Sequence, residues 1–270
     1  AELARALGRS KDSFFTSLRI FSSLAEMREG RASGHSRRVA DLARAIARKL
    51  GLPDDQAQEI MIAGLLHDIG MIGFTDELLR TPWPQLEPAE WVAVQDHAAK
   101  GAALLMGLEA LAGSAKLIRS HHERIDGRGF PDGLRGEAIP LGARILAVAD
   151  EYDSAQTGRL LGKRLPAGEA ESYVMLGAGT RTGQEVVQAL AMVLHDRRGA
   201  GGQTSRKLAL AQLAPGMCLA ADLHSRAGML LLAAGQQLSA TQIAQLKELE
   251  RSEGRALVVT VLAEKARAAA

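Results

Sequence analysis

Histidine residues cluster in the first half of the chain in a way that could bind metal ions. The chain has seven histidines, and five of them lie between residues 35 and 122, namely His35, His67, His97, His121 and His122. A histidine taken singly is more often a packed or surface residue than a ligand, but this clustering favours a shared role. Imidazole ligands suit iron, manganese, zinc or nickel better than calcium or magnesium. We therefore expect a transition-metal site.

Two aspartates add carboxylates to this set. Asp68 follows His67 after two leucines, and Asp150 follows the apolar run 145–149. An unpaired carboxylate buried at such a position costs several kcal/mol, and a bound cation removes that cost; for Asp150 a helix-end or salt-bridge role is the alternative. Seven protein ligands are more than one ion usually binds while it leaves room for a water molecule. We therefore expect two ions that are bridged by Asp68. Two such ions can activate a shared water, which predicts hydrolysis of a phosphate ester.

The elements that must position these residues are mainly helical. Apolar residues at helical spacing predict helices over 11–28, 36–50, 53–68, 88–105 and 114–122, one after Pro140, and two over 167–177 and 184–196. Residues 123–139 are too rich in glycine and proline for a helix and are expected to form a loop. The glycine-rich run 199–206 predicts a linker. Beyond it, strands over 208–222, 229–233 and 255–261 and a helix over 239–251 are expected.

The expected fold is therefore mainly α, a helical bundle with a small mixed α/β appendage at its C-terminal end. We divide the chain into an N-terminal helix and linker at 1–30, a metal-binding helical domain at 31–198, the linker at 199–206, and an α+β appendage at 207–270 whose role the sequence does not indicate.

Composition narrows the partners and the compartment. The 33 basic and 31 acidic residues are interspersed and leave a net charge of +2, which argues against a DNA partner. No apolar run approaches the length of a membrane span. The single Cys218 cannot form an internal disulfide, so we expect the cytoplasm. Because the first residue is Ala1, we expect an upstream regulatory domain outside this chain.

Five features follow one another within residues 12–197: HSRRVADLARAIARKLGL, LLHDIG, the single His97, HHERIDGRGFPDGL and ARILAVADEYD. In order and spacing they resemble the HD-GYP family of bacterial cyclic di-GMP phosphodiesterases. The resemblance implies that one ion is held by His35, His67, Asp68 and Asp150, and the other by Asp68, His97, His121 and His122. It also implies a catalytic role for Asp68. Gly129, Phe130 and Pro131 match the tripeptide that names the family, with Phe in place of Tyr.

The resemblance extends to residues around the metal site. It implies substrate-binding roles for Asp153, Arg159 and Arg128, and an arginine suits a phosphate through its fork of donors. Glu123 follows the histidine pair and could accept a hydrogen bond from a ligand imidazole or be a solvated loop residue. Trp83 and Trp91 are expected to pack helices rather than stack bases, because neither aromatic partners nor a basic cluster accompany them in the sequence.

Three departures from the family pattern concern charge around the site. Met71 stands where the family usually has a lysine, and the missing donor could cost roughly 3 kcal/mol, about a hundredfold in rate. Arg31 occupies the position of a glutamate that accompanies a third ion, so two ions are expected. The stretch 159–162 (Arg-Leu-Leu-Gly) lacks a second basic residue unless Lys163 or Arg164 replaces it.

The expected activity is metal-dependent hydrolysis of cyclic di-GMP to pGpG or onward to GMP. A weakly active or inactive metal-containing receptor, which senses the dinucleotide and signals through GGDEF-type or other proteins, is the alternative. An HD enzyme acting on another phosphodiester or nucleotide is a third. A homodimer and two-component regulation are compatible with the sequence.

Overall fold

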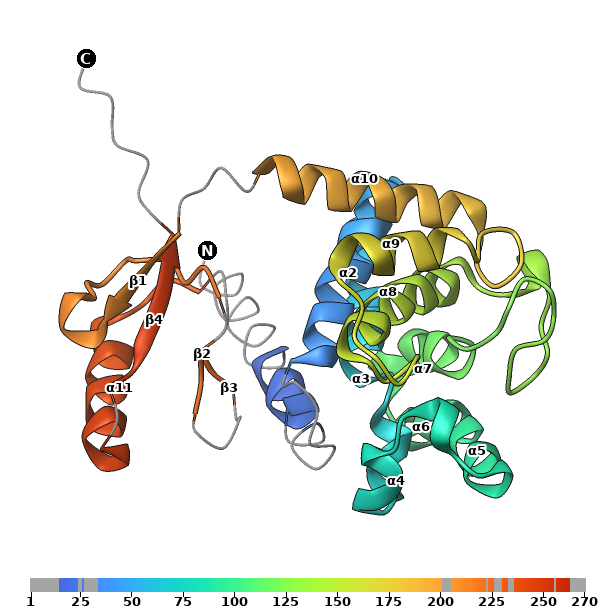
Figure 1. The fold of residues 1–270 in the computed structure, drawn as a ribbon, viewed down its shortest axis with the longest axis horizontal. Helices are drawn as coiled ribbons and strands as arrows, with labels where there is room; N and C mark the ends of the chain where they lie inside the picture. The colour runs from blue at the N-terminus through green and yellow to red at the C-terminus, as the bar shows by residue number, and fades with distance from the viewer. Residues whose placement is uncertain are drawn as a thin grey trace. The chain divides into compact units, whose positions relative to one another are not determined.

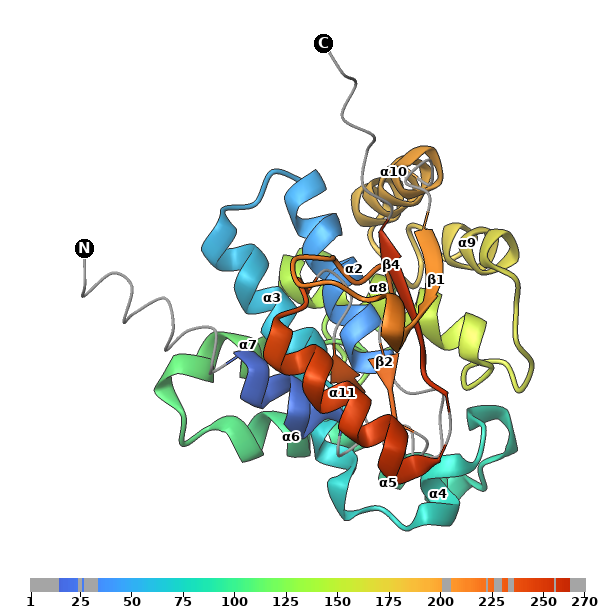
Figure 2. The ribbon, with the colours of Figure 1, turned by 90° about the vertical axis from the view of Figure 1, so that its left-hand side faces the viewer.

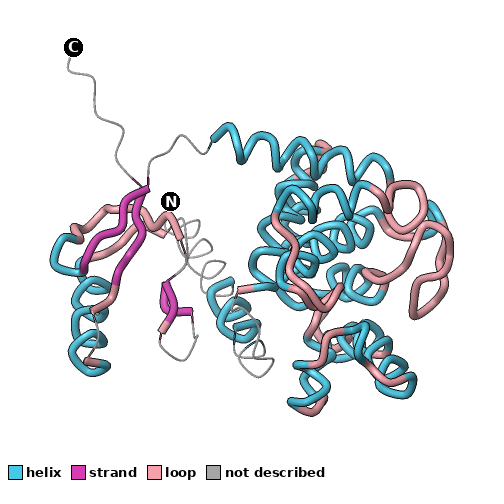
Figure 3. Tube along the Cα trace, in the orientation of Figure 1, coloured by secondary structure: helices cyan, strands magenta, loops and turns pink. Residues whose placement is uncertain are grey.

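The structure is a computed structural model of the chain, and it describes residues 15–23, 26, 34–200, 205–221, 223–225, 230–232, 236–254 and 256–262. The chain forms two compact units, residues 1–195 and 196–270. In the described ranges the first unit consists of helices and loops, and the strands belong to the second unit (Figure 3). The expected fold class, mainly α with a small mixed appendage, is confirmed. Within the described residues no helix is long and apolar enough to cross a lipid bilayer.

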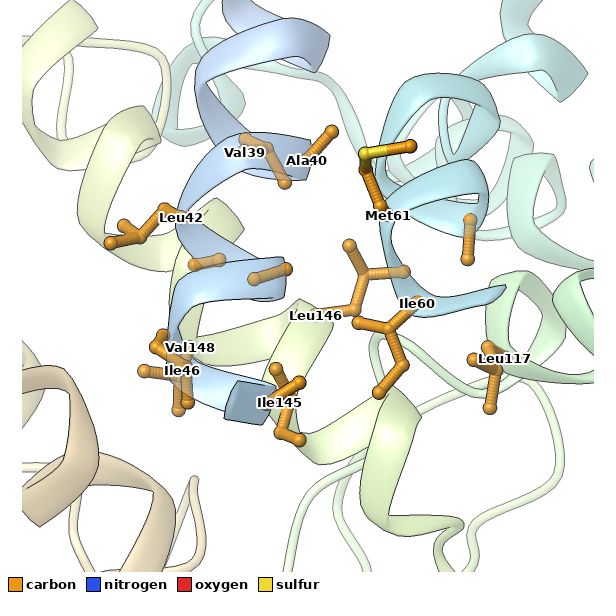
Figure 4. Close-up of a cluster of buried hydrophobic side chains, with 14 of the residues drawn as sticks. Val39, Ala40, Leu42, Ile46, Ile60, Met61, Leu117, Ile145, Leu146 and Val148 are labelled. Atoms are coloured by element: carbon orange, nitrogen blue, oxygen red, sulfur yellow. The ribbon is translucent and has the colours of Figure 1, made fainter. Parts of the chain in front are cut away.

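Four helices build the core of the first unit (Figure 1). They are α2 (His35–Lys49), α3 (Asp54–Leu66), α7 (Ala112–Arg119) and α8 (Leu141–Thr157). Figure 4 shows their buried side chains, which include Val39 and Ile46 from α2, Ile60 from α3, Leu117 from α7 and Leu146 from α8. The apolar residues of α2 recur at helical spacing and so form one buried stripe. The expected helix over 36–50 is confirmed. The helix expected over 53–68 ends earlier, at Leu66, so His67 and Asp68 lie between α3 and the following 3₁₀ helix.

The ends of these helices follow local rules. The chain after α2 turns at Gly51, which adopts a left-handed φ of 78° that favours glycine. Pro53 precedes α3, and Asp54 and Asp55 occupy its first turn, where acidic groups complement the helix dipole. Before α2, residues 15–23 and Glu26 are helical; the other residues of the expected helix 11–28, and Arg31, lie outside the described residues.

A group of shorter helices carries residues 69–111. It contains the 3₁₀ helix η1 (Ile69–Gly73), α4 (Asp76–Arg80), η2 (Trp83–Gln85), α5 (Pro88–Gln95), α6 (His97–Leu105) and η3 (Glu109–Leu111). The single helix expected over 88–105 is wrong, because the chain breaks at Asp96. There the carbonyl of Val94 accepts from the Asp96 amide and lies within hydrogen-bond distance of His97 Nδ1, which interrupts the regular helical pattern. The break places His97 at the start of α6.

The remaining helices of the first unit cover its core. The loop expected over 123–139 is confirmed and contains only the short η4 (Gly136–Ala138). Helix α8 packs against α2, α3 and α9 (Ala167–Met175), and α10 (Gln184–Ala200) follows. The predicted linker 199–206 overlaps the last residues of α10 and the first residues of the next strand, β1.

The second unit has its own apolar cluster beneath two antiparallel strand pairs. Strand β1 (Ser205–Ala209) pairs with β4 (Val258–Leu262), and β2 (Leu223–His224) pairs with β3 (Leu230–Leu232). Figure 2 shows β1 beside β4, together with α11 (Ala240–Glu253); η5 (Leu210–Gln212) follows β1. The strand expected over 208–222 is wrong beyond Ala209. Pro215 has no N–H to donate to a ladder, and Gly216 turns the chain with a φ of 89°.

Candidate metal centre

Three histidines lie at helix ends, where Nδ1 of each ring meets a backbone carbonyl three residues earlier in the chain. His67 ends α3, and its Nδ1 lies 2.9 Å from the carbonyl oxygen of Gly64. His121 follows α7, with Nδ1 2.6 Å from the carbonyl of Ile118; His97 Nδ1 meets Val94 in the same way. A carbonyl oxygen only accepts, so in each ring Nδ1 carries the proton and donates it. In its neutral form each ring therefore presents an Nε2 lone pair, the form that binds a metal.

These lone pairs face one another inside the protein. The Nε2 atoms of His97 and His121 lie 3.4 Å apart. Since both Nδ1 atoms are already protonated, neither Nε2 has a hydrogen to offer the other unless a ring becomes charged. Nε2 of His67 and of His122 are buried and have no hydrogen-bond partner in the described part of the chain. Unsatisfied buried nitrogens that converge in this way fit a bound cation.

Asp68 lies between two groups of histidines. Its Oδ2 is 3.5 Å from Nε2 of His67 and 3.9 Å from Nε2 of His35, whereas its Oδ1 is 3.6 Å from Nε2 of His97. The described residues contain two clusters whose ligand atoms lie within 4.8 Å of one another, one of His35, His67 and Asp68 and one of His97, His121 and His122. Asp150 Oδ1 joins the first cluster, 3.3 Å from Nε2 of His35. One carboxylate therefore has an oxygen for each cluster.

His35 is oriented by charges from two sides. Its Nδ1 lies 2.7 Å from Oδ2 of Asp153, and that carboxylate also accepts from Arg38 at 2.6 and 2.9 Å. Glu26, which is buried, accepts from the backbone N–H groups of Gly34 and Ser36 and so anchors the start of α2. A carboxylate behind a ligand histidine sets the ring orientation and raises its basicity. The structure thus places Asp153 behind His35, while its expected contact with substrate stays a prediction.

The protonation of the two clusters differs in the protein without bound ions. Burial, together with the charges that His97 and His67 could carry, lowers the pKa of His121 to about 3. Burial also lowers the pKa of His97 and holds that of His122 well below its usual range. Burial opposes a charge on His35 too, but Asp150 and Asp153 outweigh it and raise the pKa of His35 to about 10. His97, His121 and His122 therefore favour the neutral form. Asp150 and Asp153 favour a positive charge on His35.

The loop after His122 approaches the site very closely. A Cβ on Gly129 would lie 2.4 Å from the amide nitrogen of Arg124 and 2.5 Å from the carbonyl oxygen of His122, so only glycine fits. The ring of Phe130 then lies 4.8 Å from that of His122. The carboxylate of Glu123 accepts from the loop amides of Asp132 at 2.6 Å and Leu134 at 2.9 Å. Its observed partners are loop amides, and the expected hydrogen bond to a ligand imidazole is not among them.

Arg159 brings a guanidinium group to the edge of the centre. It follows α8 after Gly158, and its Nη1 lies 3.1 Å from Oδ2 of Asp68. Nη2 lies 2.9 Å from the sulfur of Met71, a side chain that is only 1% exposed, and the guanidinium sits 5.2 Å from the ring centroid of Trp83. Arg159 therefore holds a positive charge beside the carboxylate that lies between the two clusters. Lys163 and Arg164 are exposed.

A cavity of about 360 Å³ opens next to the histidines, and part of its wall is aromatic. It is lined by His121, His122 and Asp150 and by Trp83, Trp91 and Phe130. Trp83 and Trp91 contact each other edge to face at 5.6 Å, and Trp91 lies 6.0 Å from Phe130. The expectation that the tryptophans lack aromatic partners is therefore wrong. Arg128 also lines this cavity, as the expected role in substrate binding requires.

Comparison with known proteins assigns the family. Residues 19–186 match the HD domain. The chain belongs to the HD domain family. Within it, the relatives and the HD-GYP segments place the chain among the HD-GYP proteins.

Two curated relatives of this HD-GYP protein are named as phosphodiesterases of different cyclic dinucleotides. A "3'3'-cGAMP-specific phosphodiesterase 3" of Vibrio cholerae is 34% identical over 175 residues, which cover 65% of this chain and 38% of that protein. A "Cyclic di-GMP phosphodiesterase" of Thermotoga maritima is 34% identical over 181 residues, 66% of this chain and 49% of that protein. The chain thus spans between about two fifths and one half of the length of these relatives.

Solved structures agree on the fold. A structure of an HDG"Y"P protein from Bdellovibrio bacteriovorus is similar with a TM-score of 0.52 and 26% identity, covering 60% of this chain and 51% of that one. A cyclic GMP-AMP specific phosphodiesterase of Vibrio cholerae has a TM-score of 0.54 at 20% identity, covering 68% and 49%, and supports the HD fold alone.

The HD-GYP fold brings together all seven histidine and aspartate residues expected at the metal site. Sequence reasoning missed Arg38, which contacts Asp153 from 115 positions away, and Arg181, which contacts Glu151 across 30 positions. It also missed the aromatic cavity wall. These residues carry no local signal, because each acquires its partner only through the packing of distant segments.

Proposed function

We propose that the HD domain holds two divalent transition-metal ions, iron or manganese, with zinc or nickel as alternatives. The first would be bound by His35, His67, Asp68 and Asp150, and the second by Asp68, His97, His121 and His122. The observation that carries this proposal is the convergence of proton-free Nε2 atoms on both sides of one carboxylate, whose two oxygens face different clusters. Nitrogen and oxygen ligands without thiolates suit these ions.

The proposed reaction is hydrolysis of cyclic di-GMP to pGpG, with GMP as the product of a second hydrolysis. The oxygen of water bonds to phosphorus, the P–O3′ bond breaks, and O3′ takes up a proton. The ions, when bound, supply a hydroxide near neutral pH and neutralise the phosphate oxygens. Asp68 is the proposed catalytic residue because it contacts both ligand clusters. Arg159, and Arg128 at the cavity, can donate charge-assisted hydrogen bonds to the phosphate. The activities for which the relatives are named support a cyclic dinucleotide as the substrate.

The test begins with protein purified without oxygen and loaded with manganese or iron. Elemental analysis should find two ions per chain, and chromatography should show conversion of cyclic di-GMP to pGpG. Asp68→Asn should lose both ions and activity, while Asp41→Asn, an exposed carboxylate on α2 that pairs with Arg37, should retain both. Protein that binds two ions and the dinucleotide but leaves it intact would overturn the proposed reaction.

A metal-containing receptor is the second candidate, and the environment of Met71 favours it. The apolar side chain is buried at 1% exposure beside Arg159, so this position offers no donor to a phosphate, and the exposed Lys163 and Arg164 do not line the cavity. A receptor of this kind would bind cyclic di-GMP and signal through GGDEF-type or other proteins. Turnover by Met71→Lys in a chain whose parent only binds the dinucleotide would support it.

The compartment and the oligomeric state are proposed from the sequence. We propose a cytoplasmic protein that can form a homodimer. Mass measurement in solution at several concentrations tests the dimer. The role of residues 207–270 is tested by comparing the activity of the full chain with that of a chain ending after α10.

A further inference from the structure

One face of helix α8 points both to the metal centre and to the adjoining cavity. Ala147, Asp150, Glu151 and Ser154 follow one another at helical spacing, and all of them line the cavity. Asp150 belongs to the proposed metal site. Glu151 is its neighbour in the chain and has no role in binding the ions.

The carboxylate of Glu151 is held in place from one side. Its Oε1 accepts from Nε of Arg181 at 2.7 Å. Arg181 is itself fixed, because its Nη2 donates to the carbonyl of Tyr173 at 2.9 Å and its guanidinium lies 4.7 Å from the Tyr173 ring centroid. In the described part of the chain no hydrogen bond reaches the second oxygen, Oε2. A largely buried carboxylate, 14% exposed, therefore keeps acceptor capacity toward the cavity.

Thr182 adds a second unused polar group to the same cavity. Its side chain is 4% exposed, and its Oγ1 is buried without a hydrogen-bond partner among the described residues. Thr182 lines the cavity together with Glu151 and Arg181. Buried hydroxyls are normally satisfied, so this one points to a ligand that supplies the partner.

The remaining wall suits the flat face of a nucleobase. Trp83, Trp91 and Phe130 present aromatic rings to the cavity, and base-to-aromatic stacking is a general mode of nucleotide binding. The volume of about 360 Å³ lies at the lower end of the range for small-molecule sites, so it is sized for a fragment of a dinucleotide.

We propose that this cavity is a guanine subsite in which Glu151 determines base specificity. Guanine carries hydrogens on N1 and N2 that a carboxylate can accept side by side, whereas adenine places a lone pair at N1. Arg181 is then a positioning residue, and Thr182 supplies a further hydrogen bond to the base. This inference rests on the proposed hydrolysis of cyclic dinucleotides and specifies which base is read next to the metal centre.

The two tryptophans make binding directly observable. The chain has only Trp83 and Trp91, and both line the cavity, so intrinsic fluorescence reports on its occupancy. The metal-loaded full chain is titrated with phosphorothioate analogues of cyclic di-GMP and cyclic di-AMP, which resist hydrolysis. In parallel, kcat/KM is measured for cyclic di-GMP, 3'3'-cGAMP and cyclic di-AMP, and for bis(p-nitrophenyl) phosphate, which has no base.

The expected result is a preference for guanine that depends on Glu151. Loss of a hydrogen bond to a charged group corresponds to about a 10- to 100-fold change, so Glu151→Gln should reduce the preference by this factor. The preference should fall because the variant binds cyclic di-GMP more weakly. Its rate on bis(p-nitrophenyl) phosphate should stay within about twofold of the wild-type rate. Thr182→Val, which keeps the volume, should weaken cyclic di-GMP binding several-fold. Glu185→Gln serves as the control, because Glu185 also pairs with an arginine, Arg144 at 2.6 Å, but does not line the cavity.

The outcomes separate this inference from the proposed function. A wild-type chain that prefers adenine, or a Glu151→Gln chain that keeps its preference for guanine, would overturn the subsite. Equal losses on cyclic di-GMP and on bis(p-nitrophenyl) phosphate would also overturn it, since they would assign Glu151 a purely structural role. If fluorescence shows a Glu151-dependent preference for guanine without any turnover, the proposed hydrolysis fails and the subsite stands.

Discussion

Gly70 lies where η1 passes the start of α6, so a side chain here should disturb the two halves of the metal centre. A Cβ at this position would lie 2.0 Å from the carbonyl oxygen of His97 and 2.6 Å from the amide nitrogen of Gly101. Both are backbone atoms that cannot rotate away, and Cβ contacts below 3.0 Å essentially never occur. Gly70→Ala must therefore separate η1 from α6 by at least about 1 Å in a close-packed interior. The distance from Asp68 to His97 changes with it.

We expect Gly70→Ala to destabilise the protein by about 1–3 kcal/mol through overpacking, and to lower the rate by about a hundredfold because the reacting groups are displaced by about 1 Å. Thermal unfolding measures the first effect, and elemental analysis with the cyclic di-GMP assay measures the second. Gly73→Ala is the matched control, since it lies in the same η1 segment and its Cβ would meet nothing within 4 Å. Equal unfolding temperatures and equal metal content in the two variants would refute the reasoning.

Three further predictions concern the charges of the site. Asp153→Asn removes the carboxylate behind His35 and should weaken metal affinity about 10- to 100-fold, measured by competition with a chelator; unchanged affinity would contradict that role. In chelator-treated protein, His121 has a pKa of about 3 against 6.5 in the unfolded chain, so stability is lost as the pH falls below about 6.5. His35 has a pKa of about 10, so its contribution is complete below about 6.5 and is lost as the pH rises toward 10. The midpoint of thermal unfolding should therefore be highest near pH 6.5, and a midpoint that rises steadily from pH 5 to 9 would exclude this account. Arg159→Leu should lower kcat about a hundredfold with unchanged metal content, whereas Arg164→Leu, at an exposed position outside the cavity, should have little effect.

Helix periodicity predicted most of the helical unit because local patterns decide it. The apolar stripe of α2 and the acidic first turn of α3 are visible in consecutive residues. The break at Asp96 was not, because residues 88–105 continue one apolar pattern across it. What distinguishes the two helices is the double use of the Val94 carbonyl. That arrangement orients the His97 ring toward Asp68. The break in the helix is therefore explained by the contacts of His97 and not by the local apolar pattern.

The metal-ligand set could be proposed from residue types, spacing and family resemblance, since histidines and aspartates that end apolar helices are costly unless something uses them. The cavity beside them could not. Trp83 and Phe130 are separated by 47 positions in the chain, and Glu151 and Arg181 by 30. The sequence offers no signal for such pairs, because their contacts depend on how the loop after His122 and the segment after α9 pack against α8.

The residue types alone specify the chemistry available to this protein: seven imidazole and carboxylate groups that could bind metal ions, and a single cysteine, Cys218, without a second thiolate. Tertiary structure decided how that chemistry is arranged. It set the two oxygens of Asp68 against different clusters, placed Asp153 and Arg38 behind His35, and left Glu151 and Thr182 with unused hydrogen-bonding capacity in an aromatic cavity. The physical reason is that ligand identity is a property of each residue, whereas distance, burial and charge neighbours arise only when segments far apart in the chain share one core.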